Sequence, residues 1–306
     1  MRVVILMSTY QGERFIKEQL DSILSQLPEG GRLLIRDDGS SDQTVAIIQS
    51  IVDPRISLIC GPNLGFARSF FTLMAATPDT ADMIMLSDQD DIWLPHKIER
   101  AWQHLKNSGE IPTLYCARQK LVDAKLQPIG LSQRFTRKPS FQNALTENIV
   151  TGCTAAFNRA ALDLALKIDQ PEKVYFHDWW LYLVVSAFGK VIVDEEPTIL
   201  YRQHGGNAIG RGAGIWRYIE ILRFIRKKSW VHIMYSQIEQ FRIAYISQLY
   251  LPQKELLDRY FNPNQKTSIA RLILSFKRFR QSLPGDILLR SLIIFELISG
   301  RGVLPR

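Results

Sequence analysis

Three carboxylates follow a short apolar run. The run at 83–86 (MIML) has the composition of a buried strand, and Asp88, Asp90 and Asp91 come directly after it. Like charges this close repel one another and resist desolvation, so a strand that ends in them favours a compensating cation. Carboxylate clusters suit Mg²⁺ or Mn²⁺, ions that commonly also hold substrate phosphates. The D-x-D spacing therefore indicates a metal and diphosphate site, and the alternative is a solvated acidic turn.

Two earlier loops also carry polar side chains at strand ends. The predicted strand 2–7 runs into residues 8–12, and the strand 33–36 runs into Asp37 and Asp38. In open α/β sheets ligands bind along the carboxyl edge, so these loops are expected to face one ligand together with the acidic cluster. Ordinary β–α turns use the same residue types, which is the alternative for each loop alone.

A fourth loop, 61–68, opens a predicted helix. Helix N-terminal amides and an arginine can both bind phosphate, which makes Asn63, Gly65 and Arg68 candidate diphosphate contacts. A helix entry capped by Asn63 is equally consistent with the pattern.

Further candidates lie in the second half of the chain. Asp178 begins a predicted apolar helix that runs to residue 188, where it could be a cap, and Trp179 and Trp180 follow it. Aromatic faces are common at sugar sites, so the two tryptophans are candidate acceptor contacts. His204 lies between a strand end and a Gly-Gly turn, where it could reach a metal or a diphosphate. Residues 149–158 are expected to form a strand with a turn at 151–153, where a sugar could approach the backbone.

Strand and helix patterns alternate from residue 1 to about 107, which predicts a three-layer α/β/α sandwich with a mostly parallel sheet. Strands are also expected at 113–123, 191–193 and 199–201, whereas 128–147 is expected to be an irregular loop near the acceptor. The 306 residues are 46% hydrophobic and 22% charged, ample for a core. No apolar run reaches the roughly 18 residues of a membrane span. The N-terminus is expected to be a first strand rather than a leader, and three separated cysteines fit a reducing cytosol.

The positive charge is concentrated in the last third. Residues 1–211 hold 22 Lys and Arg against 24 Asp and Glu, whereas residues 212–306 hold 16 against 6. We expect a catalytic domain at 1–211 and a basic helical segment at 212–306, with a flexible crossing at 208–214. Basic amphipathic patterns at 216–228 and 269–276, and an apolar helix at 286–299, suit an anionic membrane surface. Packing on the catalytic domain or on a second copy of the chain is the alternative, and no nucleic-acid-binding motif accompanies the charge.

Together these motifs resemble glycosyltransferase family 2, the inverting GT-A enzymes, and most of all the rhamnosyltransferase-like members of bacterial polysaccharide synthesis. The resemblance covers about two thirds of the chain, in the family's order. The matching stretches are STYQGE at 8–13, RDDGSSD at 36–42, PNLGFARSFF at 62–71, SDQDDIWLP at 87–95, TGCTAAFNR at 151–159, HDWW at 177–180 and YRQHGGN at 201–207.

The resemblance implies roles for individual residues. Thr9, Tyr10 and Asp38 would line the pocket for the nucleotide base, Asp37 would support that loop, and Asp88 would contact the ribose.

It also implies that Asp90 would ligate Mg²⁺ or Mn²⁺, with His204 as a second ligand. Asp178 would be the general base. The family's acidic pair at that position reads His177-Asp178 here, so only Asp178 is carried over.

The resulting prediction is a metal-assisted inverting glycosyltransferase. It would move a sugar from a dTDP- or UDP-sugar, in particular L-rhamnose from dTDP-rhamnose, onto a lipid-linked or O-antigen-type polysaccharide acceptor. We expect it in the cytoplasm, attached peripherally to the inner face of the bacterial membrane. The alternatives are a sugar-nucleotidyltransferase, which the single glycine in STYQGERF disfavours, and a non-catalytic glycan-binding module at the membrane surface.

Overall fold

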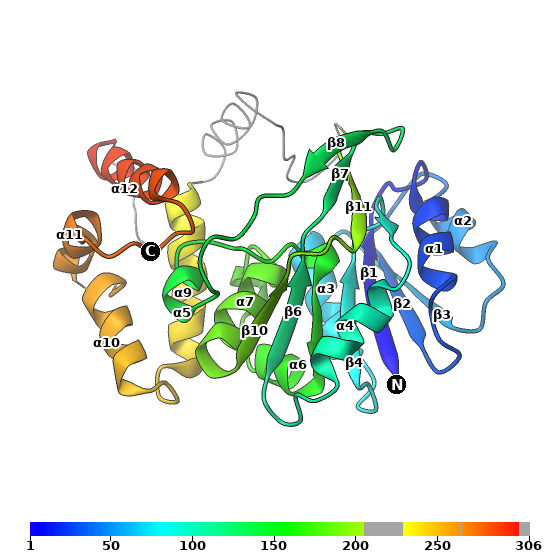
Figure 1. The fold of residues 1–306 in the computed structure, drawn as a ribbon, viewed down its shortest axis with the longest axis horizontal. Helices are drawn as coiled ribbons and strands as arrows, with labels where there is room; N and C mark the ends of the chain where they lie inside the picture. Colours follow the sequence, from blue (N-terminus) through cyan, green and yellow to red (C-terminus); the bar gives the residue numbers. More distant parts are fainter. Residues whose placement is uncertain (205–228, 263–264, 300–306) are drawn as a thin grey trace.

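The computed structural model describes residues 1–204, 229–262 and 265–299. A seven-stranded sheet with the order β10-β6-β9-β4-β1-β2-β3 forms its centre (Figure 1). The strands are parallel except β9, which runs antiparallel to β4 and β6. They are β1 (Val3–Thr9), β2 (Arg32–Asp37), β3 (Ile56–Cys60), β4 (Met83–Ser87), β6 (Thr113–Ala117), β9 (Ala156–Asn158) and β10 (Lys190–Asp194).

Helices cover both faces of this sheet, as the sequence predicted. Successive residues of β1 face opposite sides, so Val4 and Leu6 join one hydrophobic cluster and Ile5 joins the other. The first cluster includes α3 (Phe66–Ala75), α5 (Phe141–Ala144), α6 (Arg159–Ala165) and α7 (His177–Phe188). The second includes α1 (Ile16–Leu24), α2 (Thr44–Gln49) and α4 (Lys97–Leu105).

A second, four-stranded sheet with the order β5-β11-β7-β8 crosses above the carboxyl edge of the first (Figure 1). It consists of β5 (Ile92–Trp93), β7 (Lys120–Val122), β8 (Pro128–Leu131) and β11 (Ile199–Arg202). Strand β5 begins immediately after the acidic cluster and pairs antiparallel with β11. This pairing brings the chain beyond residue 200 back to the end of β4.

Two regions differ from the sequence prediction. The stretch 128–147 is not irregular: it contains β8 and α5, and Asn143 Nδ2 donates to the carbonyl of Phe279 at 2.9 Å. The predicted strand 149–158 is a short 3-10 helix, η1 (Gly152–Thr154), followed by β9. A second 3-10 helix, η2 (Pro171–Lys173), precedes α7.

The described C-terminal helices pack on the rest of the chain. They are α9 (Trp230–Tyr245), α10 (Leu251–Tyr260), α11 (Lys266–Leu274) and α12 (Leu283–Ile298). Buried residues of all four belong to the hydrophobic cluster that contains α7. The domain boundary at 211 stays a prediction, and the expected crossing at 208–214 and basic pattern at 216–228 lie outside the described residues.

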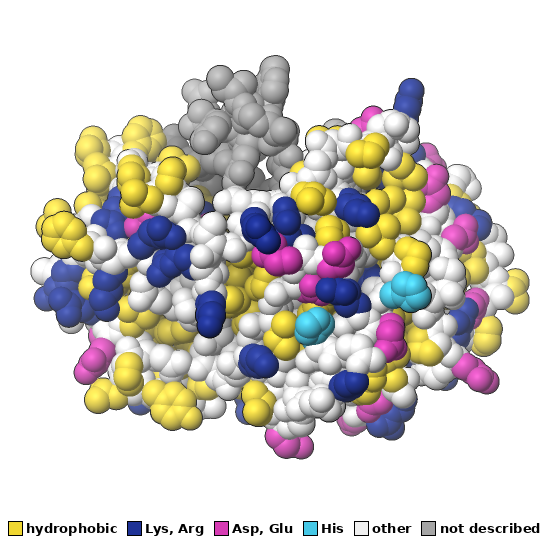
Figure 2. Space-filling model, in the orientation of Figure 1, with side chains coloured by type: hydrophobic (Ala, Val, Ile, Leu, Met, Phe, Trp, Pro, Cys, Tyr) yellow, Lys and Arg dark blue, Asp and Glu magenta, His cyan; other side chains and the backbone are white. Residues whose placement is uncertain are grey.

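The predicted amphipathic pattern at 269–276 is divided by the fold, because Ile269 and Leu272 are buried and Phe276 is exposed beyond the end of α11. Apolar side chains are also exposed along α12 (Figure 2). Among the described helices, none combines the length and the apolar character needed to cross a bilayer.

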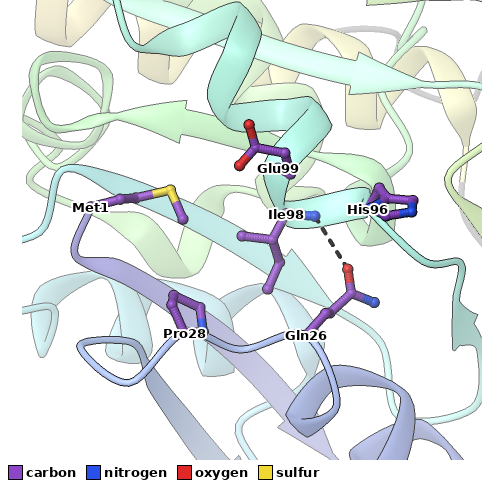
Figure 3. Close-up of a pocket in the computed structure, with 6 residues that line it drawn as sticks. All are labelled: Met1, Gln26, Pro28, His96, Ile98 and Glu99. Carbon is purple, nitrogen blue, oxygen red and sulfur yellow. Dashed lines mark hydrogen bonds between the residues drawn. The ribbon is translucent and has the colours of Figure 1, made fainter.

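A small cavity lies beside the start of β1, at the amino edge of the sheet (Figure 3). Its lining is Met1, Gln26, Pro28, His96, Ile98 and Glu99. None of the predicted site residues lines it, so it is separate from the chemistry at the carboxyl edge.

Candidate active site

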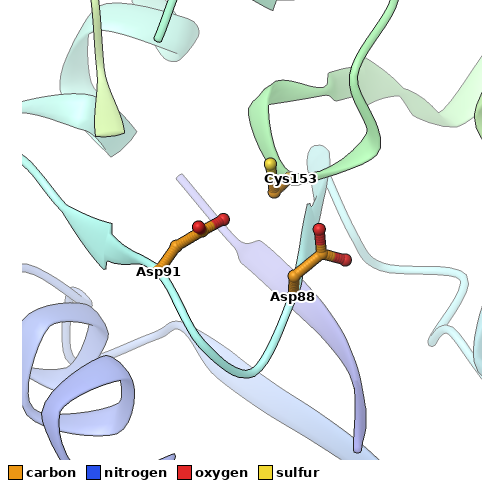
Figure 4. Close-up of side chains that lie close together, drawn as sticks. All are labelled: Asp88, Asp91 and Cys153. Carbon is orange, nitrogen blue, oxygen red and sulfur yellow. The ribbon is translucent and has the colours of Figure 1, made fainter. Parts of the chain in front are cut away.

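The acidic cluster lies at the carboxyl end of β4. Asp91 is fully buried, and its Oδ1 accepts the backbone N–H of Arg202 at 3.1 Å. Its Oδ2 is buried and has no hydrogen-bond partner among the described residues. Asp88, Asp91 and Cys153 each present one possible ligand atom within 4.8 Å of the others (Figure 4). A buried, unpartnered carboxylate oxygen next to a second carboxylate is the arrangement that a cation would complete.

Crowding of these carboxylates changes their acidity. Burial, then the nearby charges of Asp90 and Asp178, raise the pKa of Asp88 to about 7. Burial, then the nearby charges of Asp90 and Asp88, raise the pKa of Asp91 well above its usual value. Asp178 is therefore close enough to Asp88 for the two charges to interact, which places the predicted base and the predicted metal-binding loop in one site.

The two predicted metal ligands contact each other directly. His204 Nε2 and Asp90 Oδ2 are 2.8 Å apart, and the imidazole packs on the Phe15 ring with centroids 4.8 Å apart. Both side chains are partly exposed. Asp90 and His204 thus present one carboxylate and one imidazole, ligand types that a divalent cation accepts, next in sequence to the Asp88, Asp91 and Cys153 cluster. Cys153 is the one soft ligand of that cluster, whereas Mg²⁺ and Mn²⁺ favour oxygen ligands, so the carboxylates suit these ions better than the thiol does.

Two buried cations that we did not predict support the acidic loop. The Arg202 guanidinium donates to the carbonyl of Asp90 at 2.8 Å and to Glu18 Oε2 at 2.5 Å, and it stacks on Phe15. Lys97 Nζ donates to the carbonyl of Cys153 at 2.8 Å, and burial lowers the pKa of this ammonium to about 8.

Arg202 lies within the matching stretch YRQHGGN at 201–207, although the sequence prediction gave it no role. Lys97 carries no signal in sequence, because it resembles an ordinary residue in the first turn of a helix.

Asp178 lies in the first turn of α7 and is held by backbone groups. Its Oδ2 accepts the N–H of Gly152 at 3.1 Å, and its Oδ1 accepts the N–H of Trp179 at 2.7 Å. A Cβ on Gly152 would lie 3.1 Å from Nε2 of His177. The glycine therefore makes room for the first turn of α7, and this is the role that the structure gives to the small-residue turn at 151–153.

His177 has an unusual environment for an imidazole. It is stacked on Phe70 with ring centroids 4.0 Å apart, and neither ring nitrogen has a hydrogen-bond partner among the described residues. Burial lowers its pKa to about 3, so the ring is neutral. It therefore adds no charge beside Asp178.

Trp179 and Trp180 are not available to an acceptor. They are 1% and 0% exposed. Their indole N–H groups donate to the carbonyls of Ala144 and Ala165, respectively. The sequence prediction for these two residues was wrong, because both rings are needed to fill the core between α7, α5 and α6.

The loops predicted to hold the nucleotide are close to the acidic cluster. Gln89 exchanges two hydrogen bonds with the backbone of Tyr10, at 2.8 and 2.9 Å, so the β1 loop and the β4 loop are fixed to each other. The Tyr10 side chain is exposed. Thr9 is buried and its hydroxyl donates to Asp37 Oδ2 at 2.9 Å. Asp37 also accepts two backbone N–H groups of its own turn.

Asp38 organises the neighbouring phosphate-site candidates. Its carboxylate pairs with Arg36 and accepts the N–H groups of Leu64 and Gly65, both at 2.8 Å. Asp38 is 2% exposed, and these hydrogen bonds fix the 61–65 loop. Its contact with the nucleotide base stays a prediction. Asn63 and Arg68 are exposed beside the N-terminus of α3.

This architecture defines the class of protein. TarS 1–349 from S. aureus superposes with a TM-score of 0.56 at 14% identity, over 98% of this chain and 92% of that one. A mannosyltransferase from Pyrobaculum calidifontis, PcManGT in complex with GDP-Man and Mn2+, superposes with a TM-score of 0.55 at 14% identity, over 98% and 87%. The fold is that of the GT-A glycosyltransferases.

Sequence comparison gives the family. The profile of Glycosyl transferase family 2 matches residues 4–164, and the chain belongs to this family. The dTDP-rhamnosyl transferase RfbG of Shigella flexneri is 28% identical over 95% of this chain and 100% of its own length. An Escherichia coli relative, UDP-Glc:alpha-D-GlcNAc-diphosphoundecaprenol beta-1,3-glucosyltransferase WfgD, is 33% identical over 32% of this chain and 38% of its own. The protein is a glycosyltransferase.

Gly152→Ala is expected to reduce transfer without weakening donor binding. The added Cβ would lie 3.1 Å from His177 Nε2 and would therefore press on the first turn of α7, which carries Asp178. Because reaction rate is sensitive to the position of a reacting group, a small shift of this turn should lower turnover. Turnover and calorimetric donor affinity would be measured in parallel. Gly30→Ala is the matched control, since its Cβ would have only one neighbour, at 4.0 Å. Unchanged turnover in Gly152→Ala would contradict this role.

The acidic cluster predicts a pH-dependent response to metal. A folded-state pKa of Asp88 raised to about 7 means that the folded protein binds the proton more tightly than the unfolded chain does. Protonated Asp88 therefore stabilises the metal-free protein below about pH 4. This stabilisation is lost as the pH rises to about 7, which should lower the melting temperature. Mn²⁺ binds the deprotonated carboxylates, so its stabilising effect should be larger at pH 8 than at pH 5.5.

Thermal unfolding with and without Mn²⁺ at the two pH values tests this. Asp91→Asn should reduce both the pH dependence and the metal response. An equal Mn²⁺ response at both pH values would show that these carboxylates do not form the site.

Proposed function

We propose that this protein transfers a sugar, with inversion, from a nucleotide-sugar to a glycan acceptor, and that Asp178 is the general base. The observation that carries the proposal is the convergence of Asp178 with the loop of Asp88 and Asp90. Asp88 and Asp178 interact electrostatically, and His204 contacts Asp90. One carboxylate therefore faces the site of a leaving diphosphate from a different element of the fold.

Donor binding follows from the loops at the carboxyl edge. In the proposal, the base lies near Tyr10 and Thr9 and the ribose near Asp88. The diphosphate lies near Asn63, Gly65 and Arg68, where Asp38 fixes the loop through two backbone amides. A cationic side chain and helix N-terminal amides suit phosphate oxygens.

Asp90 and His204, with Asp88 and Asp91, would hold Mg²⁺ or Mn²⁺. When bound, the ion would offset the negative charge that develops on the departing diphosphate. The carboxylates cannot do this themselves, because they repel phosphate, so the proposed use of an acidic cluster next to a diphosphate depends on the ion.

Asp178 supplies the proton acceptor. The acceptor hydroxyl oxygen forms a bond to the anomeric carbon while the bond from that carbon to the diphosphate oxygen breaks, and the hydroxyl proton passes to Asp178. The leaving diphosphate takes the bonding electrons. A single displacement of this kind needs one carboxylate and inverts the anomeric centre, whereas retention would require a second carboxylate as nucleophile.

The relatives favour particular substrates. RfbG is described as a dTDP-rhamnosyl transferase and aligns over nearly all of this chain, so we propose L-rhamnose from dTDP-rhamnose as the donor. The name of WfgD includes a diphosphoundecaprenol acceptor, which supports a lipid-linked glycan as the acceptor here. Peripheral attachment to the cytoplasmic face of the membrane would follow from such an acceptor.

A donor screen tests the proposed reaction. The protein with Mn²⁺ should release dTDP from dTDP-rhamnose faster than it releases a nucleotide diphosphate from UDP-glucose, UDP-GlcNAc or GDP-mannose. EDTA should stop the release. Pyrophosphate formation from sugar 1-phosphate and a nucleoside triphosphate would instead indicate a nucleotidyltransferase, and binding without turnover would indicate a glycan-binding module.

Asp178→Asn should separate binding from chemistry. The amide keeps the shape and can still accept the Gly152 N–H, but it cannot take the proton, so transfer should fall by about 100- to 10,000-fold. Donor affinity by calorimetry should change little. Asp169→Asn, which neutralises an exposed acid before α7, is the matched control. Normal turnover in Asp178→Asn would remove this residue from the mechanism.

A further inference from the structure

Helix α12 exposes apolar side chains to solvent and buries its acidic side chains, which is the opposite of an ordinary surface helix. Its outward face is apolar, with Ile298 82% exposed and Ile287 57% exposed. The apolar residues on this face are Leu283, Ile287, Leu288, Ile294, Phe295, Leu297 and Ile298. Most of them are spaced to lie along one side of a helix, and a contiguous exposed apolar face of this kind marks a contact surface.

The two acidic residues of α12 are buried and make hydrogen bonds within the protein. Asp286 is buried, accepts the N–H groups of Phe279 and Arg280, and pairs with Arg290 at 2.7 Å. Glu296 is buried and accepts the hydroxyl of Ser229 at 2.6 Å. These bonds fix the rotation of the helix, so its apolar face is held outward by the fold.

The surroundings of this face are basic. Arg271, Phe276 and Lys277 are exposed, and in residues 265–299 the two acidic side chains are both buried. In Figure 2 the dark blue side chains of Lys and Arg lie on the same side of the molecule as the yellow side chains of α12. The solvent-facing charge of this described segment is therefore positive only.

We propose that the face of α12, together with Phe276, Arg271 and Lys277, docks on an anionic phospholipid bilayer, with the helix parallel to the surface. Apolar side chains would enter the boundary between headgroups and acyl chains, and the cations would contact the lipid phosphates. A second copy of the chain is the competing occupant. A two-fold contact through this face would bring the same cations of both copies together without acidic partners, which opposes it.

This docking would orient the active site towards the membrane. In Figure 1 the parallel strands point upward and α12 lies at the upper left, so this helix is on the side of the molecule towards which the carboxyl edge of the sheet faces. The inference rests on the proposed function in one respect: a lipid-linked acceptor would then reach Asp178 from the surface on which α12 lies.

Vesicle co-sedimentation of the whole protein tests the proposal. Wild-type protein should bind vesicles with about 30% phosphatidylglycerol, bind neutral phosphatidylcholine vesicles more weakly, and lose affinity as salt rises. The variant Ile287→Ser/Phe295→Ser/Ile298→Ser should lose at least about tenfold in affinity. A variant of exposed apolar residues elsewhere, Val52→Ser/Ile111→Ser/Ile243→Ser, is the matched control and should bind as wild type.

Several results would overturn the proposal. One is equal binding by the α12 variant, and another is an equal loss in the control. A third is a wild-type dimer that the α12 substitutions convert to monomer, which would assign the face to a second copy. Calorimetric binding of dTDP should be the same in all three proteins, showing that they are folded. If the donor assignment fails, vesicle binding is unaffected, so the two proposals fail separately.

Discussion

The structure depends on an excess of negative charge gathered at the carboxyl end of β4. Asp88, Asp90 and Asp91 lie there, and Asp178 approaches from α7 closely enough to raise the pKa of Asp88. The buried cations do not balance this charge. Arg202 also pairs with Glu18, and burial lowers the pKa of Lys97 to about 8. In the proposed reaction a divalent ion would offset this imbalance and allow the site to bind a diphosphate.

The secondary structure explains how distant residues reach this point. Strand β5 follows the acidic loop at once and pairs with β11, which carries Arg202 and His204 to Asp90. On the other side, the 3-10 turn at Gly152 receives the first turn of α7 and binds Asp178 through its N–H. Asp178 and the acidic loop are thus positioned by backbone pairing, and the side chains of Arg202 and Gln89 add further hydrogen bonds that hold the loop.

The sequence predicted the structure correctly where a residue pattern is compatible with only one kind of local structure. The alternating strands and helices predicted the sheet, and the acids at strand ends predicted that the acidic residues gather at its carboxyl edge. The prediction failed where tertiary packing decides the role of a side chain. Trp179 and Trp180 resembled sugar-binding residues but fill the core. The hydrogen bonds from the Leu64 and Gly65 amides to Asp38 could not be foreseen, because no local pattern reveals their proximity, while the contact of Asp38 with a base stays a prediction. Lys97 and Gln89 were missed because their contacts are 56 and 79 residues away in sequence.

The pair His177-Asp178 determines how much charge lies beside Asp178, the proposed general base. Family resemblance leads one to expect a second acid at position 177, and a carboxylate there would add a further negative charge to a site that already has an excess. The imidazole that occupies the position is buried, stacked on Phe70 and held neutral by a pKa lowered to about 3. It fills the space under the first turn of α7 without changing the charge beside Asp178. Two backbone N–H groups donate to the Asp178 carboxylate, while burial and the neighbouring acids raise the pKa of Asp88 to about 7.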